Sequence, residues 1–158
     1  MPIYLQIDGI KGDATHETHK QWMNIEAIHW NVGRKMSTSA GSAANREASE
    51  PTISEVVLTK VSDSSSTKLF QEAVSGSSGK LATIHLVTTD TPGQTYIEYK
   101  LTNTLIANYS IDSHGDRPVE TLRLNFTKLE VKYTPYDEKS NPQSPMIASY
   151  DLATTKAG

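Results

Sequence analysis

The stretch LRLNFTKLEVKY, residues 122–133, decides how this chain folds. Its apolar residues occupy even positions as far as Phe126 and odd positions from Leu129 onward. Alternation with a period of two is typical of a strand with one buried face, and a shift by one residue exchanges the two faces. We therefore predict a β-bulge around residues 127–128, as a curved sheet requires.

A second change of phase lies in residues 22–32, where apolar residues at odd positions up to Ala27 give way to even positions from Ile28. Further strands are expected at residues 3–7, 52–61, 81–89 and 97–111. The last of these segments is too long for one flat strand, so we expect a bend near Asn103 and Thr104. Two phase changes predict a mainly β fold, a small closed β-barrel of two antiparallel sheets.

One flanking α-helix is expected after residue 63. Two apolar pairs are spaced four residues apart: Leu69 with Ala73, and Phe70 with Val74. Asp63 or a neighbouring serine can accept hydrogen bonds from the first turn, and Gly76 is a typical stop. A helix of about three turns is not stable alone, so the apolar stripe is expected to pack on the sheet.

Residues 33–51 are polar and contain few large apolar side chains, which predicts a long extended loop. Loops longer than about 12–15 residues are uncommon in compact domains and are usually functional or disordered. The side chains that a partner could contact here are Arg34, Met36, Arg46 and Glu47. The Pro-containing C-terminal segment, residues 135–158, includes an apolar stretch at 146–152 that could add a strand.

The composition favours one polar domain spanning residues 1–158. Serine and threonine contribute 35 residues, hydrophobic residues 36%, and the formal net charge is -3. No three basic residues are consecutive, so neither nucleic acid nor membrane insertion is expected. The absence of cysteine excludes disulfides and thiolate sites. The first residues lack the basic and apolar regions of a signal peptide.

Motifs for metal binding and catalysis are weak. His16 and His19 are three residues apart, but the run is polar and we expect it to be solvated surface. Residues 112–116 have a ligand-like alternation, yet Gly and Asp between two strands also describe a plain loop. Gly79 and Lys80 lack the hydroxyl residue that follows them in a phosphate loop.

The remaining candidates are histidines and tryptophans inside predicted strands. His29 and His85 are expected to be structural, and Trp22 and Trp30 to lie in a core or an interface. We therefore expect no catalytic residue, no cofactor and no bound metal ion.

Five blocks of the sequence belong together: YLQIDGIKG (residues 4–12), IEAIHWNVG (25–33), LTKVSDSSS (58–66), LRLNF (122–126) and VKY (131–133). In this order they resemble the haemolysin-coregulated protein (Hcp) family, the tube proteins of bacterial type VI secretion. The resemblance runs from about residue 1 to residue 136 and preserves order and spacing. The opening turn, with Asp-Gly followed by Lys-Gly, is its most specific part.

The resemblance implies a homohexameric ring that stacks on further rings into a hollow tube. It implies that the long loop contacts neighbouring subunits, that secreted effector proteins travel in the lumen, and that tip and sheath components of the machine are further partners. The matching strand makes His29 and Asn31 candidates for facing the lumen. The protein would be made in the bacterial cytoplasm and secreted through the type VI apparatus.

Two other classes of function stay open at this stage. A monomeric β-barrel module for carbohydrate or another ligand could use Trp22 and Trp30, if these aromatic side chains are exposed. A hydrolase would rely on scattered polar residues, of which His29, His85 and His114 are the imidazoles in or next to strands. Aromatic exposure and the convergence of imidazoles distinguish the three interpretations.

Overall fold

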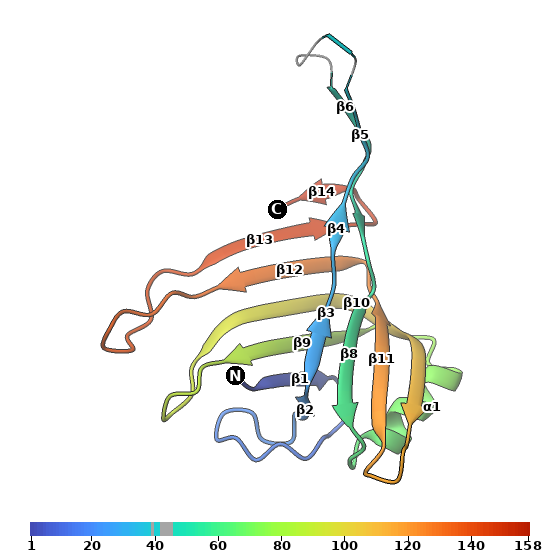
Figure 1. Cartoon of the computed structure of the whole chain (residues 1–158), viewed down its shortest axis with the longest axis vertical. Coiled ribbons are helices and arrows are strands. Elements are labelled where there is room, and N and C mark those ends of the chain that lie inside the picture. The colour runs from blue at the N-terminus through green and yellow to red at the C-terminus, as the bar shows by residue number, and fades with distance from the viewer. Residues whose placement is uncertain (39, 42–45) are drawn as a thin grey trace.

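The structure is a computed structural model that describes residues 1–38, 40–41 and 46–158 (Figure 1). Its elements in chain order are β1 (Ile3–Ile7), β2 (Met23–Ile25), β3 (Ala27–His29), β4 (Val32–Gly33), β5 (Met36–Thr38), β6 (Arg46–Ala48), β7 (Thr52–Ile53), β8 (Val56–Val61), α1 (Ser66–Ser75), β9 (Lys80–Val87), β10 (Thr95–Asp112), β11 (Val119–Asn125), β12 (Lys128–Tyr133), β13 (Met146–Asp151) and β14 (Lys156–Ala157). The fold is mainly β and its strand pairs are antiparallel, as the alternating pattern predicted.

Strand β10 belongs to two sheets. Sheet A has the order β2-β1-β9-β10-β12-β13-β14, and sheet B has the order β10-β11-β8-β3. The first part of β10 pairs with β9 and β12, and residues 105–112 pair with β11. The chain bends between these parts, where Asn103 has a φ of 56° and the register with β9 shifts. The predicted bend near Asn103 and Thr104 is confirmed.

Both predicted phase changes lie where the chain leaves one sheet for the other. Strand β11 ends at Asn125 in sheet B, and β12 begins at Lys128 in sheet A. Likewise β2 pairs in sheet A, and β3 pairs with β8 in sheet B, with Glu26 at the corner. The prediction of a bulge within one strand at residues 127–128 is therefore wrong. The inward face changes because the chain turns into a different sheet.

The expected barrel is closed by a covalent connection between two strands. Its ladder of hydrogen bonds is not continuous around the barrel. The ladder ends at β2 on one side and at β3 on the other, and these two strands are joined covalently through Glu26. The Glu26 amide donates to the Thr59 carbonyl at 2.8 Å, which holds the corner against β8. Across the described residues, no sheet closes on itself through hydrogen bonds.

Helix α1 begins and ends close to the predicted residues. The Asp63 carboxylate accepts from the Ser65 amide at 2.9 Å before the first turn, and the Gly76 amide closes the last turn on Glu72. Leu69 is fully buried, but Phe70 and Val74 are 60% and 70% exposed. The expected packing of the second apolar pair on the sheet is therefore wrong, because the helix turns this pair toward solvent.

The core lies between the two sheets and under α1. It contains Leu5, Ile7, Ile10, Met23, Ile25, Val56, Leu58, Leu69, Ala82, Ile84, Leu101, Leu122, Leu124, Phe126 and Leu129. Along β8 and β11 the buried residues alternate, which leaves the outer face of sheet B to other side chains. In the ranges that the structure describes, no helix combines the length and apolar character needed to span a lipid bilayer.

Candidate functional site

A narrow β-ribbon projects from the body of the molecule (Figure 1). We call residues 32–53 the arm. Strand β4 pairs with β7 at its base, and β5 pairs with β6 farther out, with Met36 opposite Ala48. The Lys35 amide donates to Ser49 Oγ at 2.9 Å between these two pairs. The expected long extended loop therefore contains two short pairs of strands.

The four predicted contact residues all lie on the arm with exposed side chains. Arg34 lies between β4 and β5, Met36 begins β5, and Arg46 and Glu47 begin β6. The register places Arg46 opposite Thr38, on the same face of the ribbon as Met36, and Glu47 on the other face. The arm thus offers a thioether and a guanidinium on one side and a carboxylate on the other. Their role in assembly stays a prediction.

An apolar groove lies at the base of the arm. It has a volume of about 190 Å³ and is lined by Trp30, Val32, Ile53, Leu129, Val131, Ala148, Ser149 and Tyr150. The lining residues come from the base of the arm and from strands β12 and β13. Trp30 lies edge-on to Tyr99, with the ring centroids 5.6 Å apart. Tyr99 thus packs against the indole ring that lines the groove.

Strand β13 extends this apolar surface. Met146 and Ile147 are 61% and 57% exposed although they point to opposite faces of the strand. A strand of sheet A with both faces uncovered leaves apolar area in contact with water, which is typical of a surface that meets a partner. The predicted strand at residues 146–152 is confirmed, except that it ends at Asp151.

The outer face of sheet B is largely polar. Two cross-strand rows run over β3, β8, β11 and β10: Ala27, Thr59, Thr121 and Ser110 form one row, and His29, Val57, Arg123 and Asn108 form the other. His29 is exposed at the end of β3, and Asn31 is exposed just beyond it. The Asn31 amide donates to Ser54 Oγ at 2.9 Å, which fixes the backbone there. Both predicted residues thus lie beside a hydrophilic sheet face.

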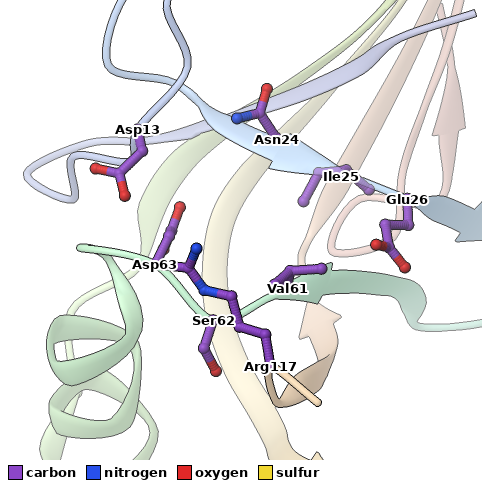
Figure 2. Close-up of a pocket in the computed structure, with 8 residues that line it drawn as sticks. All are labelled: Asp13, Asn24, Ile25, Glu26, Val61, Ser62, Asp63 and Arg117. Atoms are coloured by element: carbon purple, nitrogen blue, oxygen red, sulfur yellow. The ribbon is translucent and has the colours of Figure 1, made fainter.

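A small acidic hollow lies at the opposite end of the molecule from the arm (Figures 1 and 2). Its volume is about 210 Å³, and Asp13, Glu26, Asp63 and Arg117 are its charged residues. Burial alone would raise the pKa of Asp63, but hydrogen bonds from Lys60 and Ser65 outweigh it and lower the pKa. The Asp63 carboxylate is therefore held charged and committed to Lys60, which does not suit a general acid.

Asp63 also belongs to a buried ion cluster that the sequence pattern did not predict. Lys60 Nζ lies 3.0 Å from Glu120 Oε1 and 2.8 Å from Asp63 Oδ1. Ser62 and Tyr109 each donate to Glu120 Oε2 at 2.8 Å. The polar atoms of Lys60 and Glu120 are all satisfied, as a buried charge pair requires. The signal was the place of Lys60, which follows Val56 and Leu58 on the inward face of β8.

The interpretation of residues 16–19 as solvated surface is wrong for His19. Its side chain is buried against Tyr4 and Trp22 and bonds to His85 of β9. Trp22 and Trp30 are both half-buried, and they pack on His19 and Tyr99 respectively. Neither indole ring is fully exposed, so the condition for the carbohydrate-binding alternative is met only in part.

The histidines considered for a hydrolase lie apart. His29 is on β3, His85 is on β9, and His114 is on the connection between β10 and β11. His29 and His114 are exposed and His85 is paired with Glu98. Among the described residues, no group of three or more His, Asp or Glu side chains is arranged to hold a metal ion.

Several solved structures share this fold. A type six secretion system protein is 22% identical with a TM-score of 0.91, and the match covers 99% of each chain. Hcp1 from Salmonella typhimurium is 23% identical with a TM-score of 0.79, over 99% of this chain and 98% of the other. A type VI secretion system effector from Yersinia pestis is 23% identical with a TM-score of 0.73, over 94% and 98%.

The fold is thus that of type VI secretion proteins. A family model described as "Type VI secretion system effector, Hcp" matches residues 4–133, which is most of the chain. The chain belongs to the Hcp family, as the sequence blocks indicated. A search of curated protein sequences finds no significant match.

Proposed function

We propose that the chain is a non-enzymatic structural subunit that assembles into hexameric rings, which stack into the hollow tube of a type VI secretion system. Membership of the Hcp family supports this role. The number of six subunits is what the resemblance to that family implies. Tip and sheath components of the same machine are the expected further partners. The arm is the single feature that carries the proposal.

The arm needs a partner surface for physical reasons. All of its described side chains outside β7 and residue 51 are exposed, and a two-stranded ribbon is at best marginally stable alone in water. The apolar groove at its base is a different surface from the outer pair of strands, β5 and β6. A contact between two different surfaces is heterologous, so it generates a closed ring or an open filament. Arm-to-neighbour contacts of this kind suit both the ring and the stack.

The charge of the chain permits such stacking. The formal net charge is only -3, and the repulsion between like-charged copies in a tube grows with the square of that charge. The polar outer face of sheet B is the proposed lumen wall, with His29 and Asn31 at its edge. Hydroxyl, amide and imidazole groups hold a passing effector protein through weak and exchangeable hydrogen bonds, which allows its release.

Assembly is tested by changing the arm base. Val32→Lys places a charge beside the apolar groove and is expected to prevent ring formation, because burial of an unpaired ammonium is unfavourable. Val74→Lys, a matched change of an exposed valine on α1, is expected to leave rings intact. Native mass spectrometry and negative-stain microscopy give the subunit number. A wild-type chain that stays monomeric at every concentration would contradict the proposal.

The lumen assignment is tested with single cysteines, since the chain has none of its own. Asn31→Cys is expected to react with a bulky polymer maleimide more slowly in rings than in separated subunits, because a bore admits the polymer poorly. Ser77→Cys, on the exposed connection after α1, serves as the control. Equal labelling of Asn31→Cys in both states would place it outside the lumen.

A further inference from the structure

Three imidazoles link residues 13–22 to strand β9 through a chain of hydrogen bonds. His16 Nδ1 lies 2.9 Å from His19 Nδ1, and His19 Nε2 lies 2.8 Å from His85 Nδ1. This series of hydrogen bonds ends on β10, where His85 Nε2 lies 2.6 Å from Glu98 Oε2. His16 is partly exposed, whereas His19 is only 2% exposed. The hydrogen bonds therefore run from the surface into the side of sheet A.

Aromatic rings enclose the central imidazole. Tyr4 stacks on His19 with the ring centroids 4.7 Å apart and an interplanar angle of 14°. Trp22 meets His19 edge-on and also lies 4.7 Å from the His85 ring. The two nitrogens of His19 point to partners on opposite edges of its ring, so the three histidines do not converge on one point. This arrangement suits hydrogen bonding between the imidazole rings and not the ligation of a metal ion.

The direction of the hydrogen bonds at neutral pH follows from Glu98. Its carboxylate only accepts, so His85 carries a proton on Nε2 and, when neutral, accepts at Nδ1. His19 then donates from Nε2 and accepts at its own Nδ1. His16 supplies that proton from Nδ1, and Thr18 Oγ1 lies beside this bond, 3.0 Å from His19 Nδ1 and 3.3 Å from His16 Nδ1. With one proton on each ring, both inter-ring hydrogen bonds form in the same direction.

The chain can accept one further proton without losing a hydrogen bond. A proton on His16 leaves both bonds as they are, a proton on His85 reverses the direction of both, and a charged His19 donates to both neighbours. A second further proton is different. Two of the three rings then carry protons on both nitrogens, and wherever these two rings lie, one N–H faces another N–H. The second proton therefore breaks one inter-ring bond.

Neighbouring groups determine the pH at which this inter-ring hydrogen bond is lost. The pKa of His19 is lowered to about 4, first by burial and then by repulsion from His85 and His16. The neighbouring Tyr4 is neutral, since burial raises the pKa of its hydroxyl. A cation over its ring face would gain some attraction, but burial has the larger effect on His19.

His85 is surrounded by charges from β10 and β12. Burial is the main cause that lowers its pKa, and Lys100 and Lys132 lower it further. The hydrogen bond and charge of Glu98 act in the opposite direction. Lys100 Nζ also lies 3.6 Å from Glu98 Oε1, and this ion pair offsets part of the attraction between the carboxylate and a proton on His85. The His85 ring, at the inner end of the hydrogen-bonded histidines, is therefore kept neutral at neutral pH.

The backbone of the segment is bonded mainly to itself. The Gly12 amide donates to Gln21 at 2.8 Å, the Ala14 amide to Trp22 at 2.9 Å, and the Gln21 amide back to Ala14 at 2.9 Å. Its contact with sheet A is made by side chains. These are the His19–His85 hydrogen bond and the packing of Ala14 and Trp22 against Tyr4 and Val87. In Figure 1 the segment is the blue loop between β1 and β2.

We propose that His16, His19 and His85 form an acid-sensitive latch that holds residues 13–22 on sheet A and releases them when the second proton binds. In the released segment His19 regains the ordinary imidazole pKa of about 6.5. The open state therefore binds more protons than the closed state below this pH, and acid favours opening. The release uncovers the buried side chains of Tyr4 and Val87. This device goes beyond the proposed assembly and does not depend on it.

Amide hydrogen exchange measured by mass spectrometry tests the latch. Between about pH 7 and about pH 5, corrected for intrinsic exchange, protection of residues 14–22 is expected to fall about tenfold or more. The His19→Gln variant keeps a hydrogen-bonding side chain but does not titrate, so its corrected protection is expected to be independent of pH. His114→Gln, which removes an exposed imidazole, is expected to behave like the wild type. Equal pH dependence in His19→Gln, or none in the wild type, would overturn the latch.

Nitrogen NMR of the wild-type histidines gives a second test that requires no variant. At neutral pH we expect His19 and His85 to carry their protons on Nε2 and His16 on Nδ1. On acidification, the second ring is expected to become charged together with the loss of protection in the segment. Two fully charged rings among the three histidines, with the segment still protected from exchange, would refute the proposal. Dissociated subunits give the same readout, so failure of ring assembly and failure of the latch are distinguishable.

Discussion

The arm and the buried ion cluster lie at opposite ends of the molecule and treat their charged residues in opposite ways. On the arm, Arg34, Arg46 and Glu47 are exposed, and the outer ribbon is held by strand pairing and by the Lys35–Ser49 hydrogen bond. In the cluster, Lys60 and Glu120 are fully buried between β8, β11 and α1. The same residue types serve solvent-facing contact in one place and internal packing in the other. A charged residue in this sequence therefore does not by itself predict a position on the surface.

The largest expected effect is at the buried end. Lys60→Met keeps the length of the side chain but leaves Glu120 charged and without its partner, and we expect it to lower the free energy of unfolding by about 3–5 kcal/mol. Urea denaturation measures this. Lys68→Met, on the exposed side of α1, is the matched control, with an expected change within about 0.5 kcal/mol. Similar losses in both variants would show that the buried pair is not special.

The same cluster predicts a dependence on pH. Burial raises the pKa of Glu120, but hydrogen bonds from Ser66, Tyr109, Lys60 and Ser62 outweigh it and lower the pKa. The stabilisation is therefore complete above the ordinary glutamate pKa of about 4.3 and is lost as the pH falls through the lower folded value. Unfolding measured along a pH series should show this loss in the wild type and less of it in Glu120→Gln.

An intermediate effect is expected on α1, where buried and exposed apolar residues are neighbours. Leu69→Ala removes a fully buried side chain and should cost about 2–5 kcal/mol of unfolding free energy. Phe70→Ala removes a larger side chain that is exposed, so its cost should stay within about 0.5 kcal/mol in the separated subunit. Thermal unfolding compares the two. A larger loss for Phe70→Ala would mean that the helix packs with its other face inward.

The smallest effect on stability is expected at the arm. Met36→Ser and Arg46→Ala should each change the unfolding free energy of the separated subunit by no more than about 0.5 kcal/mol, because neither side chain is buried. The same variants should weaken assembly, measured as the subunit concentration at which rings form. If they unfold the subunit instead, the arm is part of the folding core and the comparison with the ion cluster fails.

Local patterns predicted the elements well. The strand at residues 3–7 and the helix near residues 66–75 were predictable from alternation, capping and four-residue spacing. The two phase changes located both sheet crossings, although their interpretation as bulges was wrong. Alternation reports which face is buried, and a crossing between sheets changes that face as a bulge does. The neighbouring strands alone distinguish the two cases.

The buried polar residues were harder to predict. His19 is bonded to a residue 66 positions away, and Lys60 to one 60 positions away. The inward place of Lys60 on β8 was a usable signal, since a lysine in an apolar alternation needs a buried partner. His19 lies in a polar run with no periodic pattern. Its burial depends on Tyr4 and His85, which the sheet register brings to it.

Local sequence specified the alternation of faces, helix α1, the projecting polar segment and the Hcp family, because these depend on residues close together along the chain or on preserved blocks. The tertiary structure alone decided which polar side chains lie inside. Burial of a charge or an imidazole is stable only opposite a matching group, and that match is created by strand register between distant segments.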